Sequence, residues 1–215
     1  DQDVQSLVAR GYQVFQPNFR GSSGFGKAFA DKGRRQWGRA MQTDVEDGFD
    51  HLVAEGLAEA DRACIFGYSY GGYAAMAAAT LTPEKYQCAI AAAGVSDLHA
   101  FLRRERREEG SNSEAYQYWV AHIGHPGRDK ETIKAVSPVE HAGNLSRPLL
   151  ILHGKDDGVV DYEQAERMEK ALRKAGKFFR LVTLENSSHS YMPEEDELIY
   201  YTEIIAFLET YLPVN

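Results

Sequence analysis

Short apolar runs alternate with amphipathic stretches along the chain, a pattern that predicts strands followed by helices. The apolar runs predict buried strands, because they are short, continuous and bounded by polar or glycine-containing segments. They span residues 14–18, 63–67, 88–93, 147–154 and 178–184. Apolar residues at helical spacing predict helices over 41–56, 72–81, 161–175 and 194–211, after an N-terminal helix that ends at Gly11. Residues 97–136 are polar and aromatic, and predict irregular structure with helical stretches.

This order of elements predicts one α/β domain spanning residues 1–215. Strands that read as continuous apolar runs are typical of a mostly parallel sheet covered by helices on both faces. In such a sheet the reactive groups lie at the carboxyl ends of the strands. Residues that directly follow each predicted strand are therefore the candidates for chemistry.

A serine stands directly after the strand predicted at 63–67, in the sequence Gly67-Tyr68-Ser69-Tyr70-Gly71. A strand that turns straight into a helix holds the corner residue in a strained conformation and exposes its side chain. Neighbouring segments crowd such a corner, so small residues are expected at both Gly67 and Gly71. The amide of Tyr70 begins the helix and is the expected first donor to an oxyanion that forms beside Ser69.

An acid and a base follow two later strands. Asp156 and Asp157 come after the strand predicted at 147–154, and His189 comes after the strand predicted at 178–184. The chain order of serine, acid and histidine is that of α/β-hydrolases. A serine hydroxyl is a weak nucleophile, so a histidine must accept its proton while a carboxylate orients the imidazole. The residues alone leave Asp156 and Asp157 as alternatives.

Composition limits the other classes of function. The formal net charge of −8 argues against nucleic acid as the main partner. No apolar run approaches the roughly 20 residues that span a membrane. The two cysteines, Cys64 and Cys88, are too few for a disulfide framework, and we expect them to be small buried side chains. His122 and His125 lack further ligands nearby, so neither a metal nor a cofactor is expected. The run RRERREEG at 103–110 predicts a solvated helix face with ion pairs, rather than a site for an anionic substrate group.

At these residues the chain resembles the catalytic domain of the prolyl oligopeptidase family of serine peptidases. The similar stretches are GYQVFQPNFRGSSGFGKAF, DVEDGFDHLV, FGYSYGGYAA, RPLLILHGKDDGVV and SSHSYM, which extend over nearly the whole length. The resemblance implies a nucleophile at Ser69, a base at His189, and an acid four residues after the histidine of an HG pair, which selects Asp157. It implies hydrolysis of short peptides, with the dipeptidyl and acylaminoacyl branches most similar in GYSYGGY.

The resemblance also suggests residues that contact the substrate. Val95 and Phe101 lie near the pocket for the residue before the scissile bond, although a core position suits them equally. Tyr68 either contacts the substrate or packs beside the corner. Val159 stands where the dipeptidyl branch typically has an asparagine that holds the substrate, so this position departs from that branch.

The resemblance implies segments that these 215 residues do not include. They are a β-propeller domain, a strand between 14–18 and 63–67, and a loop upstream of Val14 that supplies the second oxyanion donor. We therefore expect the 215-residue chain by itself to be inactive and to form a homo-oligomer, by strand exchange or through its open sheet edge. An esterase or lipase on the same fold, or a non-catalytic oligomerisation module, remain alternative functions.

Overall fold

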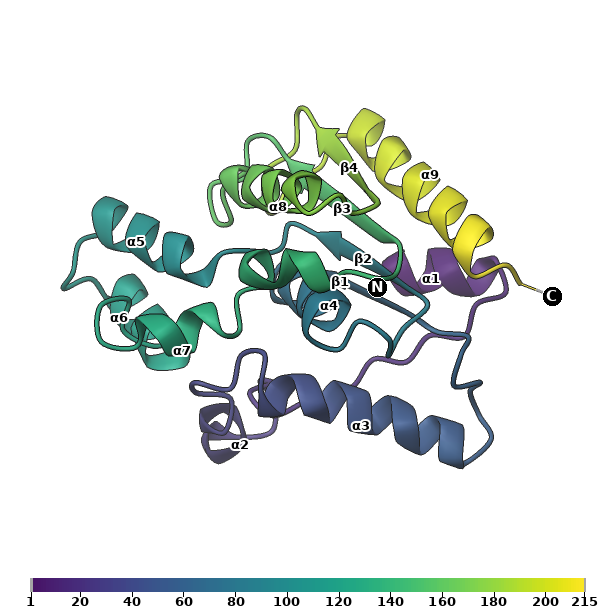
Figure 1. Cartoon of the computed structure of the whole chain (residues 1–215), viewed down its shortest axis with the longest axis horizontal. Coiled ribbons are helices and arrows are strands. Elements are labelled where there is room, and N and C mark those ends of the chain that lie inside the picture. Colours follow the sequence, from purple (N-terminus) through teal and green to yellow (C-terminus); the bar gives the residue numbers. More distant parts are fainter. Residues whose placement is uncertain (1, 215) are drawn as a thin grey trace.

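A computed structural model describes residues 2–214 of the chain, and these residues form a layered α/β structure around a parallel sheet (Figure 1). The sheet of the described residues comprises β1 (Cys64–Tyr68), β2 (Cys88–Ala92), β3 (Leu149–Gly154) and β4 (Phe179–Leu184). All neighbouring pairs are parallel, and the order in space, β1-β2-β3-β4, repeats the order along the chain. The predicted fold class and four of the predicted strands are confirmed.

Helices cover both faces of this sheet, as the continuous apolar strands predict. One face packs against α4 (Tyr70–Leu81), α8 (Glu163–Lys174) and the 3-10 helix η1 (Pro138–Asn144). The other packs against α1 (Gln2–Ala9) and α9 (Glu194–Tyr211), which lie side by side in Figure 1. Alternate residues of a strand serve the two faces, so Ile151 packs toward α8 while Leu150 and Leu152 pack toward α9.

A further core packs against another side of α4, and several of its helices come from residues 97–136, which the sequence predicted to be mostly irregular. It joins α3 (Ala40–Ala54) to α5 (Leu98–Glu108), α6 (Glu114–His122) and α7 (Lys130–Lys134), with the short α2 (Lys27–Asp31) nearby. The ring of Trp37 contacts Tyr70, Tyr73 and Trp119 at its centre. This core fixes α5 against the start of α4, and so connects the helical layer to the corner that carries Ser69.

The prediction of a strand at 14–18 is wrong, because residues 12–19 pair with no strand in the described part of the chain. Val14 and Phe15 are exposed, and a cleft of about 280 Å³ separates this segment from β1. Its lining includes Gln13 and Val14 of this segment and Phe66 and Tyr68 of β1. A β-strand forms only where a neighbouring strand supplies partners for its backbone hydrogen bonds. This segment has no such neighbour in the sheet of the described residues, so its apolar run alone did not suffice to make a strand. The edge of β1 is left without a strand partner.

The expectation that the two cysteines are small buried side chains holds for Cys88, whereas Cys64 is half-buried, and the two are not separate thiols. Cys64 and Cys88 are register partners on β1 and β2, and a disulfide joins them. The sequence showed that both lie in strands, but strand order and register decide whether two cysteines meet, and neither follows from spacing. Among the helices of residues 2–214, none is both long enough and apolar enough to cross a membrane.

Candidate active site

The backbone at Ser69 makes an abrupt turn between β1 and α4. Ser69 has φ 58° and ψ −115°, in the region that side chains rarely adopt, and α4 begins at the next residue. Such strain persists only where surrounding contacts determine the conformation. Here the Ser69 amide donates to the carbonyl of Ala92 at 2.9 Å, and the Tyr73 amide donates to the Ser69 carbonyl at 3.0 Å. The serine is therefore held on both sides, by β2 and by its own helix.

The glycines around Ser69 have different reasons to be small. A Cβ on Gly67 would lie 2.4 Å from the carbonyl carbon of Gly71, so β1 and α4 are in contact there. A Cβ on Gly71 would meet nothing within 4 Å, which corrects the expectation that this position must also be small. The crowded second glycine is Gly72, where a Cβ would lie 2.3 Å from the carbonyl oxygen of Ala92.

Two loops bring an acid and a base to Ser69. The His189 Nδ1 atom lies 2.7 Å from Asp157 Oδ2, and its Nε2 atom lies 2.9 Å from Ser69 Oγ. Because the carboxylate accepts, Nδ1 donates, which leaves Nε2 to accept the serine hydroxyl proton. The other oxygen of Asp157 accepts the amides of Val159 and Val160 at 2.9 and 2.8 Å. The structure thus places Asp157, and not Asp156, on the histidine, as the family resemblance implied.

The loop that carries His189 is fixed to the β3 end and to α9. The Asp156 amide donates to the Ser187 carbonyl at 3.1 Å, which joins the acid loop to the histidine loop. On the far side the buried carboxylate of Asp196 accepts the hydroxyl of Ser187 at 2.7 Å and the amide of Asn186 at 2.8 Å. Sequence reasoning missed Asp196, which looked like one of several acidic residues at a helix start.

Tyr68 and His153 form hydrogen bonds to the backbone of the loops that carry His189 and Asp157. The Tyr68 hydroxyl donates to the backbone carbonyl of His189 at 2.8 Å, and burial together with the nearby Asp157 charge raises the pKa of Tyr68 to about 12. It therefore stays a donor and holds the histidine rather than presenting its hydroxyl to solvent. His153 is fully buried, and its Nε2 donates to the carbonyl of Val160 at 2.7 Å. Burial lowers the pKa of His153, so its 3.6 Å approach to Asp157 is not an ion pair.

The expected substrate-contacting residues divide into two groups. Val95 and Phe101 are only 2% and 1% exposed and belong to the core between α4 and α5, so of their two expected roles the burial supports core packing and corrects the assignment to substrate contact. Val159 is 48% exposed beside Asp157, where a substrate can reach it. The amide of Tyr70, at the start of α4, has no acceptor among residues 2–214 and remains available to an oxyanion.

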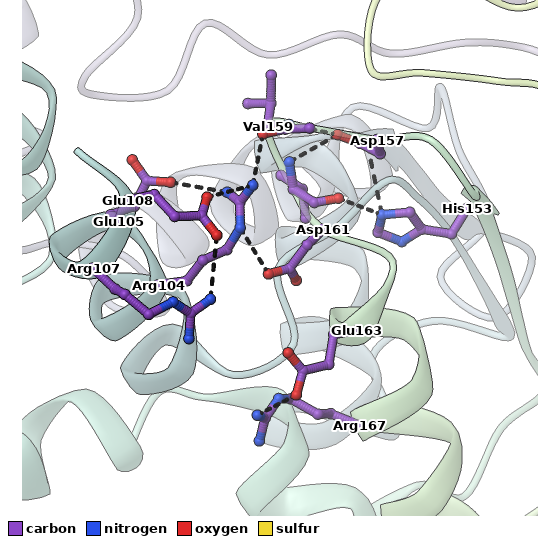
Figure 2. A network of polar contacts seen from close by, with 12 residues as sticks. Arg104, Glu105, Arg107, Glu108, His153, Asp157, Val159, Asp161, Glu163 and Arg167 are labelled. Carbon is purple, nitrogen blue, oxygen red and sulfur yellow. Dashed lines mark hydrogen bonds and ion pairs between the residues drawn. The ribbon is translucent and has the colours of Figure 1, made fainter.

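The run 103–110 lies at the end of α5 and carries ion pairs, as the sequence predicted, but Arg104 and Glu105 depart from the predicted solvated face. Figure 2 shows Arg104 pointing from α5 toward the loop that carries Asp157, while Arg107 lies outside this contact. Glu105 is also buried, and burial raises its pKa. The spacing of apolar residues in α5 could not predict this burial, because the residues that point inward, Arg104 and Glu105, are themselves charged.

The fold and the site define an α/β-hydrolase in which a serine, an aspartate and a histidine follow three strands of one parallel sheet. The comparison with family models then gives the family. The chain belongs to the prolyl oligopeptidase family, whose model matches residues 1–214. The resemblance in the sequence motifs is thereby confirmed.

Its relatives include peptidases of the two branches that the sequence suggested. Dipeptidyl aminopeptidase BIII of Pseudoxanthomonas mexicana is 30% identical over 213 residues, which cover 95% of this chain and 30% of the relative. Acylamino-acid-releasing enzyme of Rattus norvegicus is 22% identical over 214 residues, covering 96% and 28%. The chain thus spans about 30% of the length of these relatives.

Solved structures share the same fold. A puromycin-hydrolyzing peptidase of Mycobacterium tuberculosis superposes with a TM-score of 0.83 at 30% identity, over 92% of this chain and 29% of the other. An acylaminoacyl peptidase in complex with Z-Gly-Gly-Phe-chloromethyl ketone superposes with a TM-score of 0.80 at 24% identity, over 92% and 32%.

Proposed function

We propose that these residues form the catalytic domain of a serine peptidase that cleaves short peptides, of the dipeptidyl- or acylaminoacyl-peptidase type. The observation that carries the proposal is the continuous hydrogen-bond chain from Asp157 through His189 to Ser69, at 2.7 and 2.9 Å. Ser69 stands at a strained corner, and the next amide, that of Tyr70, has no acceptor among the described residues 2–214. The relatives named above are peptidases.

The reaction follows from these contacts. His189 Nε2 accepts the proton of Ser69 as Oγ attacks the carbonyl carbon of the scissile peptide bond. The Tyr70 amide and the positive end of α4 stabilise the oxyanion that forms. The protonated imidazole, held by Asp157, then gives its proton to the leaving amine. Water, activated by the same histidine, releases the acyl group from Ser69.

Two variants in the complete protein test the nucleophile and the acid. Ser69→Ala is expected to lower kcat by about a millionfold, as loss of a triad serine does elsewhere. Asp157→Asn is expected to lower it by about ten-thousandfold, because the amide favours the wrong imidazole tautomer. The neighbouring, exposed Asp156 provides the matched control, and Asp156→Asn should change kcat by less than twofold. A Ser69→Ala variant that keeps a tenth of the activity would refute the assignment.

The substrate class is tested with a peptide anilide and a simple ester measured in parallel. The same fold serves peptidases and esterases, so only turnover separates them. Cleavage of the anilide with free or acylated N-termini would also separate the dipeptidyl from the acylaminoacyl type. Ester turnover without any peptide cleavage would favour an esterase, and failure of a fluorophosphonate probe to label Ser69 would favour a non-catalytic module.

A further inference from the structure

Arg104 differs from the other arginines of its helix in where its side chain lies. Its side chain is 16% exposed, whereas that of Arg107, one turn along α5, is 73% exposed. Figure 2 shows its guanidinium between α5 and the loop that links β3 to α8, the loop that carries Asp157. A largely buried arginine needs hydrogen-bond acceptors for its guanidinium N–H groups. The acceptors that Arg104 contacts therefore show which parts of the structure it connects.

The contacts of Arg104 connect the helix to both ends of one short turn. Its Nη2 donates to the carbonyl of Gly158 at 3.0 Å, and its Nε pairs with Asp161 Oδ2 at 3.1 Å. From α5 itself, Glu105 and Glu108 pair with the guanidinium at 3.2 and 2.8 Å and fix its plane. The rigid, planar fork of an arginine suits such a multiple contact in a way that a lysine does not.

The turn between Gly158 and Asp161 is the one that orients the carboxylate of Asp157. The amides of Val159 and Val160, inside that turn, are the two donors to Asp157 Oδ1. A displacement of the turn therefore rotates the carboxylate away from His189. On the inner side the turn is held by His153 through the Val160 carbonyl, and on the outer side Arg104 contacts the residues that flank the two amides.

The charge of Arg104 also matches a need of the turn. Burial raises the pKa of Asp161, and the Arg104 guanidinium opposes that rise. Without the arginine, the turn would carry a half-buried carboxylate with its cation removed, next to Glu108 and Glu163. Such a carboxylate moves toward water, and it would pull the turn with it.

We propose that Arg104 is a positioning residue, which holds the turn 158–161 so that Asp157 keeps its hydrogen bond to His189 during peptide cleavage. The inference rests on the proposed function. Arg104 reaches the reaction only through the turn, so its loss changes the rate of the chemical step and leaves substrate contacts in place. A displacement on the scale of 1 Å in such a group costs about a hundredfold in rate.

The test compares Arg104→Met with Arg107→Met in the complete protein, with turnover expressed per serine that a fluorophosphonate probe can label. Arg104→Met is expected to lower kcat by about ten- to a hundredfold and to change KM by less than threefold. Arg107→Met is expected to change neither by more than twofold. In proton NMR spectra, the low-field signal of the histidine Nδ1 proton should weaken in Arg104→Met and persist in Arg107→Met.

A double-variant cycle separates positioning from a general loss of stability. Asp161→Asn should reproduce most of the loss in kcat, and adding it to Arg104→Met should cause little further loss, because both break one contact. Glu108→Gln, which removes a contact on the helix side only, should leave kcat within about threefold of the wild type. Independent, additive losses of kcat in the cycle would overturn the inference.

The remaining outcomes distinguish this inference from the proposed function. A tenfold rise in KM at unchanged kcat would make Arg104 a substrate contact, and equal kcat in Arg104→Met and Arg107→Met would remove its role altogether. Either result would leave the proposed function standing, provided that Ser69→Ala is inactive. An active Ser69→Ala protein would instead refute the proposed function, whatever the arginine variants show.

Discussion

Replacing Gly67 by alanine should disable the site through a single methyl group. The new Cβ would lie 2.4 Å from the carbonyl carbon of Gly71 and 2.5 Å from its oxygen, and both are backbone atoms that cannot rotate away. Non-bonded carbons prefer separations of about 3.5–4.0 Å, so the first turn of α4 must move by about 1 Å relative to β1. That turn carries Ser69 and the Tyr70 amide away from His189, which predicts a loss of about a hundredfold in kcat.

Gly71 provides the control, because it lies in the same motif and an added Cβ there meets nothing within 4 Å. Gly71→Ala should keep kcat within about threefold and raise the free energy of unfolding by up to about 1 kcal/mol, since alanine loses less backbone entropy in a helix. Gly67→Ala should lower it by about 1–3 kcal/mol through overpacking. Urea unfolding and peptide-anilide turnover measure the two effects separately.

Two results would contradict this reasoning. One is a Gly67→Ala protein with more than a third of wild-type kcat, which would mean that the corner relaxes without moving Ser69. The other is a Gly71→Ala protein as inactive as Gly67→Ala, which would restore the expectation that the motif needs both glycines to be small.

Three further predictions follow from contacts around the site and the sheet. Tyr68→Phe removes one hydrogen bond to the His189 carbonyl, worth about 1 kcal/mol, and should lower kcat about fivefold with little change in KM. A higher KM at unchanged kcat would instead show that Tyr68 contacts the substrate. Because burial lowers the pKa of His153 below its ordinary value of 6.5, the unfolded state binds the proton first as the pH falls, and the free energy of unfolding should decrease below about pH 6.5. Urea unfolding at several pH values should show a weaker decrease in His153→Gln, and identical slopes would count against this account. The unpaired β1 edge should make the 215-residue chain self-associate, and size-exclusion chromatography with light scattering would contradict this by showing a stable monomer.

Predictions from the sequence were most accurate for features that neighbouring residues along the chain determine. The corner at Ser69 follows from a strand, small residues and a helix start, all within a dozen positions. Asp157 and His189 could be placed at the same sheet edge, because parallel strands bring their carboxyl ends together. The choice of Asp157 over Asp156 came from the family motif, since both residues stand in the same loop and alternation along a turn does not say which one points inward.

The features that the sequence missed depend on partners far along the chain. The run at 14–18 is apolar enough for a strand, but a strand also needs a neighbouring strand within hydrogen-bonding distance, and a cleft lies between this run and the free edge of β1. Arg104 stands in a charged helical run, and only the arrangement in space shows that its partners Gly158 and Asp161 lie more than fifty positions away. The pairing of Cys64 with Cys88 likewise required the register of β1 and β2.

The agreement between strand order in space and strand order along the chain has a consequence for biosynthesis. A ribosome delivers β1, β2, β3 and β4 in the order in which each pairs with its predecessor, so the sheet can grow by one strand at a time. Ser69 follows the first of these strands, but His189 follows the last. Ser69 is therefore synthesised early but stays unactivated until β4 docks and brings His189 to it, so an unfinished chain has no base to activate its serine against neighbouring nascent polypeptides.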